Sequence, residues 1–174
     1  MRRTFLFLLT VLSVTAGLMV FNWIPRAIGG RGTVEHVSLQ GIPQRLATRG
    51  VFRPSYFPEL LQWPPAEILT RGGGASLLMH FNSRVDERTE LSIAQAANSS
   101  DLIPSRIEPV NVITEKRLPF RGHRAHLTIA TCRDGSPCNR IRWQEDGISL
   151  AVVFRGPEQD LLRIAQSLIP EKIR

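Results

Sequence analysis

The sequence is poor in the residues that bind metal ions and haem. It has only two cysteines and four histidines among 174 residues. The cysteine spacing, Cys-x5-Cys, is not that of a zinc site, and no Cys-x-x-Cys-His motif for haem attachment occurs. His123 and His126 are the only close histidine pair, and on a strand they would point to opposite faces. We therefore expect no metal site and no bound cofactor.

Motifs of common enzyme classes are also missing. The chain has no Gly-x-Ser-x-Gly elbow, Walker loop or dinucleotide fingerprint. The glycine-rich segment 71–74 lacks the lysine and hydroxyl of a phosphate loop, so it predicts a turn. Asp86, Glu87 and Glu90 lie in a polar stretch that is typical of a solvated surface. The sequence favours a non-catalytic protein, and an enzyme is the third hypothesis after the two given below.

Acidic residues are absent from the first 31 positions, and this absence explains most of the basic character of the chain. The formal net charge is +7, of which the arginines at positions 2, 3, 26 and 31 supply +4 and the remainder of the chain +3. Arginines on both sides of an apolar run are typical of a membrane segment. The charge therefore gives little reason to expect a nucleic-acid partner, and we expect none.

Residues 4–24 form the only long uncharged run and predict a transmembrane helix. These 21 residues would span about 31 Å as a helix, which matches the hydrocarbon core of a bilayer. Trp23 is placed as an interfacial anchor beside Pro25, and Arg2 and Arg3 anchor the other end. The alternative is a cleaved signal peptide, for which Ala16-Gly17 supplies small residues.

The predicted helix also carries a set of small or hydroxylated residues that suit close contact with other membrane helices. They are Thr10, Ser13, Ala16 and Gly17. Arg2 and Arg3 favour a cytoplasmic N-terminus, which places the rest of the chain on the periplasmic side of a bacterial inner membrane. We expect an anchor at residues 1–24, a linker at 25–50, which is rich in glycine and proline, and a single folded domain at 51–174.

Cys132 and Cys138 enclose the turn-forming sequence Arg-Asp-Gly-Ser-Pro, and this arrangement favours a disulfide in an oxidising compartment. Two unrelated thiols are the alternative. If Cys132 lies opposite Cys138 in a hairpin, Leu127 lies opposite Trp143 and Ile129 opposite Ile141. The dipeptide Asp146-Gly147 then predicts a second two-residue hairpin with Trp143 opposite Leu150 and Ile141 opposite Val152. Both turns place the same apolar residues on one face.

The rest of the chain predicts further strands and one helix. Alternating apolar residues indicate strands near 77–81, 91–96 and 110–114, and the proline-rich segment 52–65 predicts an apolar strap across a sheet. A helix begins at Pro157, and Pro170 ends it. Its apolar stripe contains Leu161, Leu162, Ala165, Leu168 and Ile169. The predicted fold class is α+β: a twisted antiparallel sheet with a C-terminal amphipathic helix, behind a transmembrane anchor.

The polar face of the cysteine-containing hairpin is predicted to carry a basic cluster. Arg124, His126, Arg140 and Arg142 share this face, and Lys116, Arg117 and Arg121 are close in sequence. Such a cluster is suited to an acidic partner or to lipid headgroups. An ordinary solvated strand face, with Asp146 paired to Arg124, is the alternative.

The C-terminal part of the chain resembles an uncharacterised extracytoplasmic domain family that often follows the membrane helix of anti-sigma-type proteins. The resemblance is carried by residues 141–154, by the helical segment 161–168 and by Tyr56-Phe57-Pro58-Glu59. It implies a sheet-plus-helix fold distantly like that of lipoprotein carriers, and it implies no catalytic residue. Only three residues precede the predicted membrane helix, so a sigma-binding module has no room there.

These observations favour two functional hypotheses. The first is a non-catalytic accessory or scaffold subunit of a larger bacterial membrane complex, in the class of respiratory or photosynthetic assemblies, with other membrane subunits as partners. The second is a membrane-anchored module that binds a lipid or another ligand, or senses the state of the envelope. The first rests on the short N-terminal tail, the missing catalytic set and the small residues of the predicted membrane helix.

Overall fold

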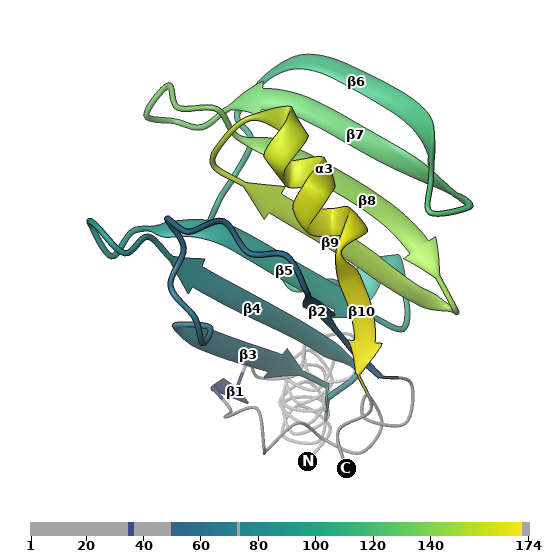
Figure 1. The fold of residues 1–174 in the computed structure, drawn as a ribbon. Helices are drawn as coiled ribbons and strands as arrows, with labels where there is room; N and C mark the ends of the chain where they lie inside the picture. The colour runs from purple at the N-terminus through teal and green to yellow at the C-terminus, as the bar shows by residue number, and fades with distance from the viewer. Residues whose placement is uncertain (1–34, 37–49, 73, 172–174) are drawn as a thin grey trace, which may run out of the picture. The chain divides into compact units, whose positions relative to one another are not determined.

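The computed structural model describes residues 35–36, 50–72 and 74–171. In this part of the chain an eight-stranded antiparallel sheet and a two-stranded sheet accompany one α-helix (Figure 1). The predicted α+β class with a C-terminal helix is confirmed. The elements are β1 (Glu35–His36), β2 (Val51–Pro54), β3 (Glu67–Arg71), β4 (Ser76–Asn82), β5 (Thr89–Ala96), the 3₁₀ turn η2 (Ser99–Asp101), β6 (Asn111–Phe120), β7 (His123–Thr131), β8 (Asn139–Glu145), β9 (Ile148–Phe154), α3 (Glu158–Gln166) and β10 (Leu168–Glu171).

The strands of the large sheet are arranged in the order β1-β3-β4-β5-β9-β8-β7-β6, and β10 pairs with β2 in the small sheet. α3 contacts β8 and β9 on one face of the large sheet, which we call the helix face (Figure 1). The opposite face is called the cleft face below. The main core lies on the helix face, where Leu161, Ile164 and Ala165 of α3 pack with apolar residues such as Leu127 and Ile141.

The hairpin between β8 and β9 has the predicted register. Trp143 lies opposite Leu150 and Ile141 opposite Val152. Asp146 and Gly147 both have positive φ angles, 51° and 72°, as a two-residue type I′ turn requires. The right-handed twist of the flanking strands matches this turn, which is why the dipeptide is a strong local signal.

The register between β7 and β8 differs from the prediction by two residues. Leu127 lies opposite Ile141, and Thr128 opposite Arg140. The reason is a tighter turn than the cysteines suggested: Gly135 adopts a φ of 79° and its N–H donates to the Cys132 carbonyl at 2.9 Å. Since a shift of two residues preserves the side-chain alternation, each residue still lies on its predicted face.

The C-terminal helix is shorter than the apolar stripe predicted. It ends at Gln166, and the next residues form β10, with Leu168 opposite Pro54 and Ile169 opposite Arg53. Pro170 disfavours helical geometry at Ile169, and its own ring would clash with the carbonyl four residues earlier. Leu168 is therefore a strand residue, not a helix residue, when it packs into the core, while Ile169 is 52% exposed.

The proline-rich segment between β2 and β3 packs against the core as predicted. Phe57 makes an edge contact with Phe81 of β4, with ring centroids 5.0 Å apart, and Leu61 is fully buried. Trp63 is 44% exposed at the outer side of this cluster. The strap thus closes the end of the helix face near β4.

The N-terminal predictions fall mostly outside the described residues. This applies to the transmembrane helix, to its small residues Thr10, Ser13, Ala16 and Gly17, and to the anchors Arg2, Arg3 and Trp23. Of the predicted linker, the described strand β1 pairs with β3 at one edge of the sheet. In the part of the chain that the structure describes, no helix is both long and apolar enough to cross a membrane.

Candidate functional site

Strand register aligns the cleft-face residues in rows that run across the sheet. One row changes character halfway: it is apolar on β3, β4, β5 and β9 and basic on β8, β7 and β6. Its members, from β3 to β6, are Leu69, Leu78, Ala94, Ala151, Arg142, His126 and Arg117. The cleft face therefore has an apolar half and a basic half.

Segment 102–109, between η2 and β6, covers the apolar half. Ile103 packs on Leu69, Leu78 and Ala94, and Ile107 packs on the two cysteines and Val153. Since covering one half leaves the other open, a cleft of about 1100 Å³ lies between this segment and the basic half. Small side chains form its floor, among them Ser92, Ala94, Ser149 and Ala151.

The cleft has a surplus of positive charge. The cationic side chains that reach it from the sheet are Arg117, Arg124, Arg140 and Arg142, against the two carboxylates Glu108 and Glu115. His126 lies among the cations, directly opposite both Arg117 and Arg142. All four residues of the predicted basic cluster, Arg124, His126, Arg140 and Arg142, thus line one cleft.

The cleft arginines lack ion pairs of the kind that several other arginines in the described chain make. Arg121 binds Glu145 at 2.7 Å, and Arg155 binds Asp134 at the same distance. Among the described residues, no carboxylate forms an ion pair with the four arginines of the cleft, and the predicted pair between Arg124 and Asp146 is not formed. Arg121, which is close in sequence to the cluster, points away from it toward Glu145 and the Gln166 carbonyl.

Arg140 is the most enclosed of these arginines. It is half-buried, and its Nε atom has no hydrogen-bond acceptor. Burial lowers the pKa of its guanidinium, the neighbouring charge of Arg142 lowers it further, and Glu115 opposes both effects. An anion in the cleft would offset this unfavourable electrostatic environment.

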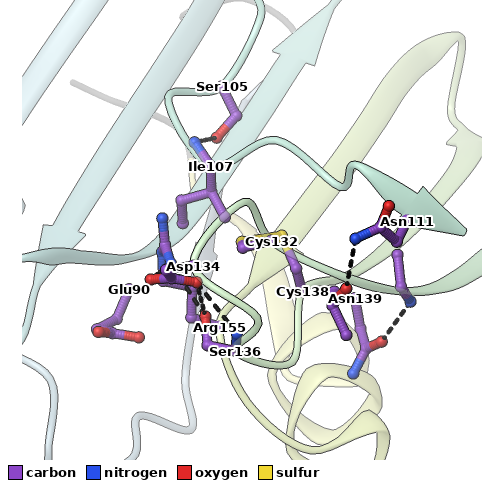
Figure 2. Close-up of a disulfide and its surroundings, with 12 residues drawn as sticks. Glu90, Ser105, Ile107, Asn111, Cys132, Asp134, Ser136, Cys138, Asn139 and Arg155 are labelled. Carbon is purple, nitrogen blue, oxygen red and sulfur yellow. Dashed lines mark hydrogen bonds and ion pairs between the residues drawn. A yellow bond between two sulfur atoms is a disulfide. The ribbon is translucent and has the colours of Figure 1, made fainter.

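A salt bridge fixes the covering segment in place. Arg106 donates to Glu67 of β3 at 2.8 Å. The Ser105 hydroxyl also accepts a hydrogen bond from the Ile107 N–H at 2.9 Å, which closes a local turn (Figure 2). Together with the buried side chains of Ile103 and Ile107, these contacts make the segment a fixed wall of the cleft.

A buried polar chain that sequence patterns did not indicate lies beside this wall. The His80 Nδ1 atom lies 2.8 Å from the Ser92 hydroxyl, and its Nε2 atom lies 3.9 Å from Glu67. Burial lowers the pKa of His80 to about 4, with help from Arg106 and against Glu67. A serine, a histidine and a glutamate in line resemble a hydrolytic triad, but Ser92 and His80 are each 1% exposed. The polar chain connects neighbouring residues of β3, β4 and β5 on the cleft face.

The disulfide closes the loop between β7 and β8 at one end of the cleft (Figure 2). Cys132 and Cys138 lie at disulfide distance, with their Cα atoms 5.1 Å apart, as predicted. Asp134 at the loop tip accepts hydrogen bonds from the Ser136 hydroxyl at 2.6 Å and from Arg155 at 2.7 Å. These bonds lower the pKa of Asp134 to about 2, the Ser136 contacts contributing most.

Asn139 connects this loop to the start of α3. Its side chain accepts from the Ala130 N–H at 3.2 Å and donates to the Gly156 carbonyl at 2.8 Å. Asn139 is 3% exposed, so both bonds are sheltered from water. The disulfide loop, β8 and the helix are thereby held as one unit beneath the cleft arginines.

No family model, curated protein or solved structure matches this chain. The resemblance to the extracytoplasmic domain family therefore stays a prediction. The basic half of the cleft follows from the alternation of residues on β7 and β8, which sequence patterns predicted. The covering segment 102–109 could not be found from sequence, because Ile103 and Ile107 meet the sheet only through tertiary contacts.

Proposed function

We propose that this protein is a non-catalytic, membrane-anchored accessory subunit whose cleft docks an acidic segment of a partner membrane protein. The observation that carries the proposal is the set of four cleft arginines without carboxylate partners among the described residues. Charges left uncompensated on a protein surface carry a cost in self-repulsion, and a complementary partner removes that cost.

The geometry suits carboxylates of a protein chain. Arg124 and Arg142 present planar donor groups at the exposed side of the cleft, and Arg140 lies deeper. A carboxylate bound by an arginine makes charge-assisted hydrogen bonds, each worth roughly 1.5–3 kcal/mol. The floor of small residues leaves room for side chains that reach inward, so two or three acids spaced along one segment can be bound together.

Comparison of a cleft variant with a charge-matched control tests the proposal. The cleft variant is Arg124→Gln/Arg142→Gln, and the control is Arg133→Gln/Arg163→Gln, which removes the same charge from exposed positions on the disulfide loop and α3. The full chain is captured from native membranes solubilised in mild detergent, and the bound proteins are quantified by mass spectrometry. We expect a stoichiometric membrane partner with wild type and control, and at least a tenfold loss with the cleft variant. A chain that purifies alone, or a cleft variant that keeps its partner in full, would overturn the proposal.

The second candidate is a module that binds an amphipathic anionic lipid. It is favoured by Leu102, a partly exposed apolar side chain that lines the cleft opposite the arginines. Native mass spectrometry of the full chain distinguishes the two candidates. A lipid adduct on the wild type that disappears with the cleft variant supports this module, and a wild-type chain free of lipid removes it.

A further inference from the structure

Within the part of the chain that the structure describes, the edge of the large sheet next to the cleft has no further strand paired to it. β6 is the last strand in the sheet order, and among the described strands it pairs with β7 alone. It is ten residues long, and seven of its ten side chains are exposed. One row of its backbone N–H and C=O groups therefore faces solvent, where another extended chain can pair with it.

The charges on this strand restrict what can pair there. Lys116 and Arg117 are both exposed near its middle, and Pro119 lies near its end. Lysine and proline on an edge strand are known devices against pairing with a second copy, since the charge disfavours close packing and proline lacks a backbone donor. With the two cations and the one carboxylate of Glu115, the strand has a net charge of +1, which favours an acidic strand as its partner.

The register connects this edge to the cleft. Arg117 lies opposite His126, and Lys116 lies opposite Leu127. Arg117 therefore points to the cleft face, and Lys116 to the helix face. On a strand added beside β6, alternate side chains would lie next to Arg117 and reach toward the row that holds His126 and Arg142.

The start of β6 provides an apolar contact. The pairing with β7 shifts between Val112 and Thr114, and at this bulge the neighbouring side chains of Val112 and Ile113 are 52% and 68% exposed. Val110, just before the strand, is 46% exposed. An incoming segment thus meets an apolar patch at one end of β6 and two cations near its middle.

We propose that the acidic partner segment binds as an additional β-strand along β6, with carboxylates beside Lys116 and Arg117 and apolar side chains on Val112 and Ile113. This inference rests on the proposed function and adds the backbone conformation and sequence class of the partner: an extended segment with acidic and apolar residues in succession. Backbone hydrogen bonds to β6 supply affinity, and the cleft arginines supply specificity.

A pair of synthetic peptides separates strand addition from simple charge attraction. The probe is an eight-residue peptide with two central glutamates flanked by valine and threonine. The control peptide has the same sequence and carries N-methyl groups on alternate backbone amides. Both have the same charge, but the methylated peptide lacks half of the backbone donors. The full chain is studied in nanodiscs of neutral lipid, with affinity measured by fluorescence anisotropy and amide exchange by mass spectrometry.

We expect the unmethylated peptide to slow exchange in residues 111–120 at least tenfold and to bind at least tenfold more tightly than the methylated one. Equal affinities with unchanged exchange in β6 would overturn strand addition while leaving the cleft as an anion site. Binding of neither peptide, even at low salt, would overturn both proposals. If phosphatidylglycerol vesicles alone protect β6, the ligand is a lipid surface and strand addition is wrong.

Discussion

Arg140 and Arg142 lie two residues apart on the cleft face of β8, and the charge of Arg142 adds to burial in lowering the pKa of Arg140. These two cations are neighbours on one face of the strand, and neither forms an ion pair with a carboxylate among the described residues. They therefore repel each other in the free protein. Under the proposed function, the charges that favour binding of an acidic partner also lower the stability of the free protein.

Removing one of these charges is therefore expected to stabilise the free protein. Arg142→Gln relieves the repulsion of Arg140, and we expect a gain of roughly 0.5 kcal/mol in the free energy of unfolding, similar to the effect of like charges that face each other on neighbouring strands. The gain shrinks at high salt, where screening already weakens the repulsion. Urea unfolding at 20 mM and 500 mM NaCl measures it, with Arg133→Gln as the control. A less stable Arg142→Gln variant at low salt would contradict this view.

His80 makes the stability of the domain depend on pH. Its pKa is lowered from 6.5 to about 4, so between these values the unfolded state binds a proton that the folded state excludes. Stability is therefore present above pH 6.5 and is lost as the pH falls toward 4. From pH 7 to pH 5 the expected loss is about 2 kcal/mol.

The variant His80→Gln tests this assignment, because glutamine can still accept a hydrogen bond from Ser92 but does not titrate. Unfolding free energies of the wild type and the variant are measured by urea at pH 7, 6 and 5. The difference between the two proteins is expected to shrink as the pH falls. Parallel pH profiles would show that His80 is not the group responsible.

The disulfide is expected to stabilise the domain mainly by restricting the unfolded chain. Cys132 and Cys138 are separated by six positions, and a closed loop of this size contributes about 2 kcal/mol in the chain-entropy model. The double variant Cys132→Ser/Cys138→Ser should lose this amount in urea unfolding. A second double variant with alanine at both positions separates loss of the cross-link from burial of new hydroxyl groups, since both cysteines are buried. An unchanged urea midpoint of the wild type on addition of a reductant would contradict a cross-linked native state.

Arg106 is expected to hold the wall of the cleft locally rather than to stabilise the whole domain. Its side chain is 62% exposed, and ion pairs of such arginines contribute about 0–1 kcal/mol. Arg106→Gln should therefore change the global unfolding free energy by less than about 1 kcal/mol. Amide exchange in residues 102–108 should nevertheless become several-fold faster, because the segment loses its bond to β3. Arg133→Gln is the matched control, and equal exchange in both variants would show that Ile103 and Ile107 suffice.

Local patterns predicted the parts of the fold that depend on neighbouring residues. The Asp146-Gly147 turn fixed the pairing of β8 with β9, and the alternation along β7 and β8 assigned the four basic residues to one face. The offset between β7 and β8 was wrong by two positions, because the conformation of Gly135 tightens the turn inside the cysteine pair. Such an error leaves every side chain on its face and so leaves the basic cluster intact.

The helix shows where periodicity fails. Leu168 and Ile169 continue the apolar stripe of α3, yet they belong to β10. Periodicity indicates only that Leu168 is buried. Whether it is buried from a helix or from a strand depends on Pro170 and on pairing with β2, which lies more than a hundred residues earlier in the chain. The buried chain of Glu67, His80 and Ser92 was missed for the same reason, since its members come from three strands whose order no local pattern encodes.

The sequence by itself determined the faces of the apolar and basic residues on β7, β8 and β9, the type I′ turn at Asp146-Gly147, the pairing of the two cysteines and the presence of a C-terminal helix. These depend on side-chain alternation and backbone preferences, which act over a few residues. Only the tertiary structure decided the strand order, the open edge at β6 and the cleft. Each of these depends on contacts between distant segments, and the cleft exists because segment 102–109 covers the apolar half of a face and leaves the basic half uncovered.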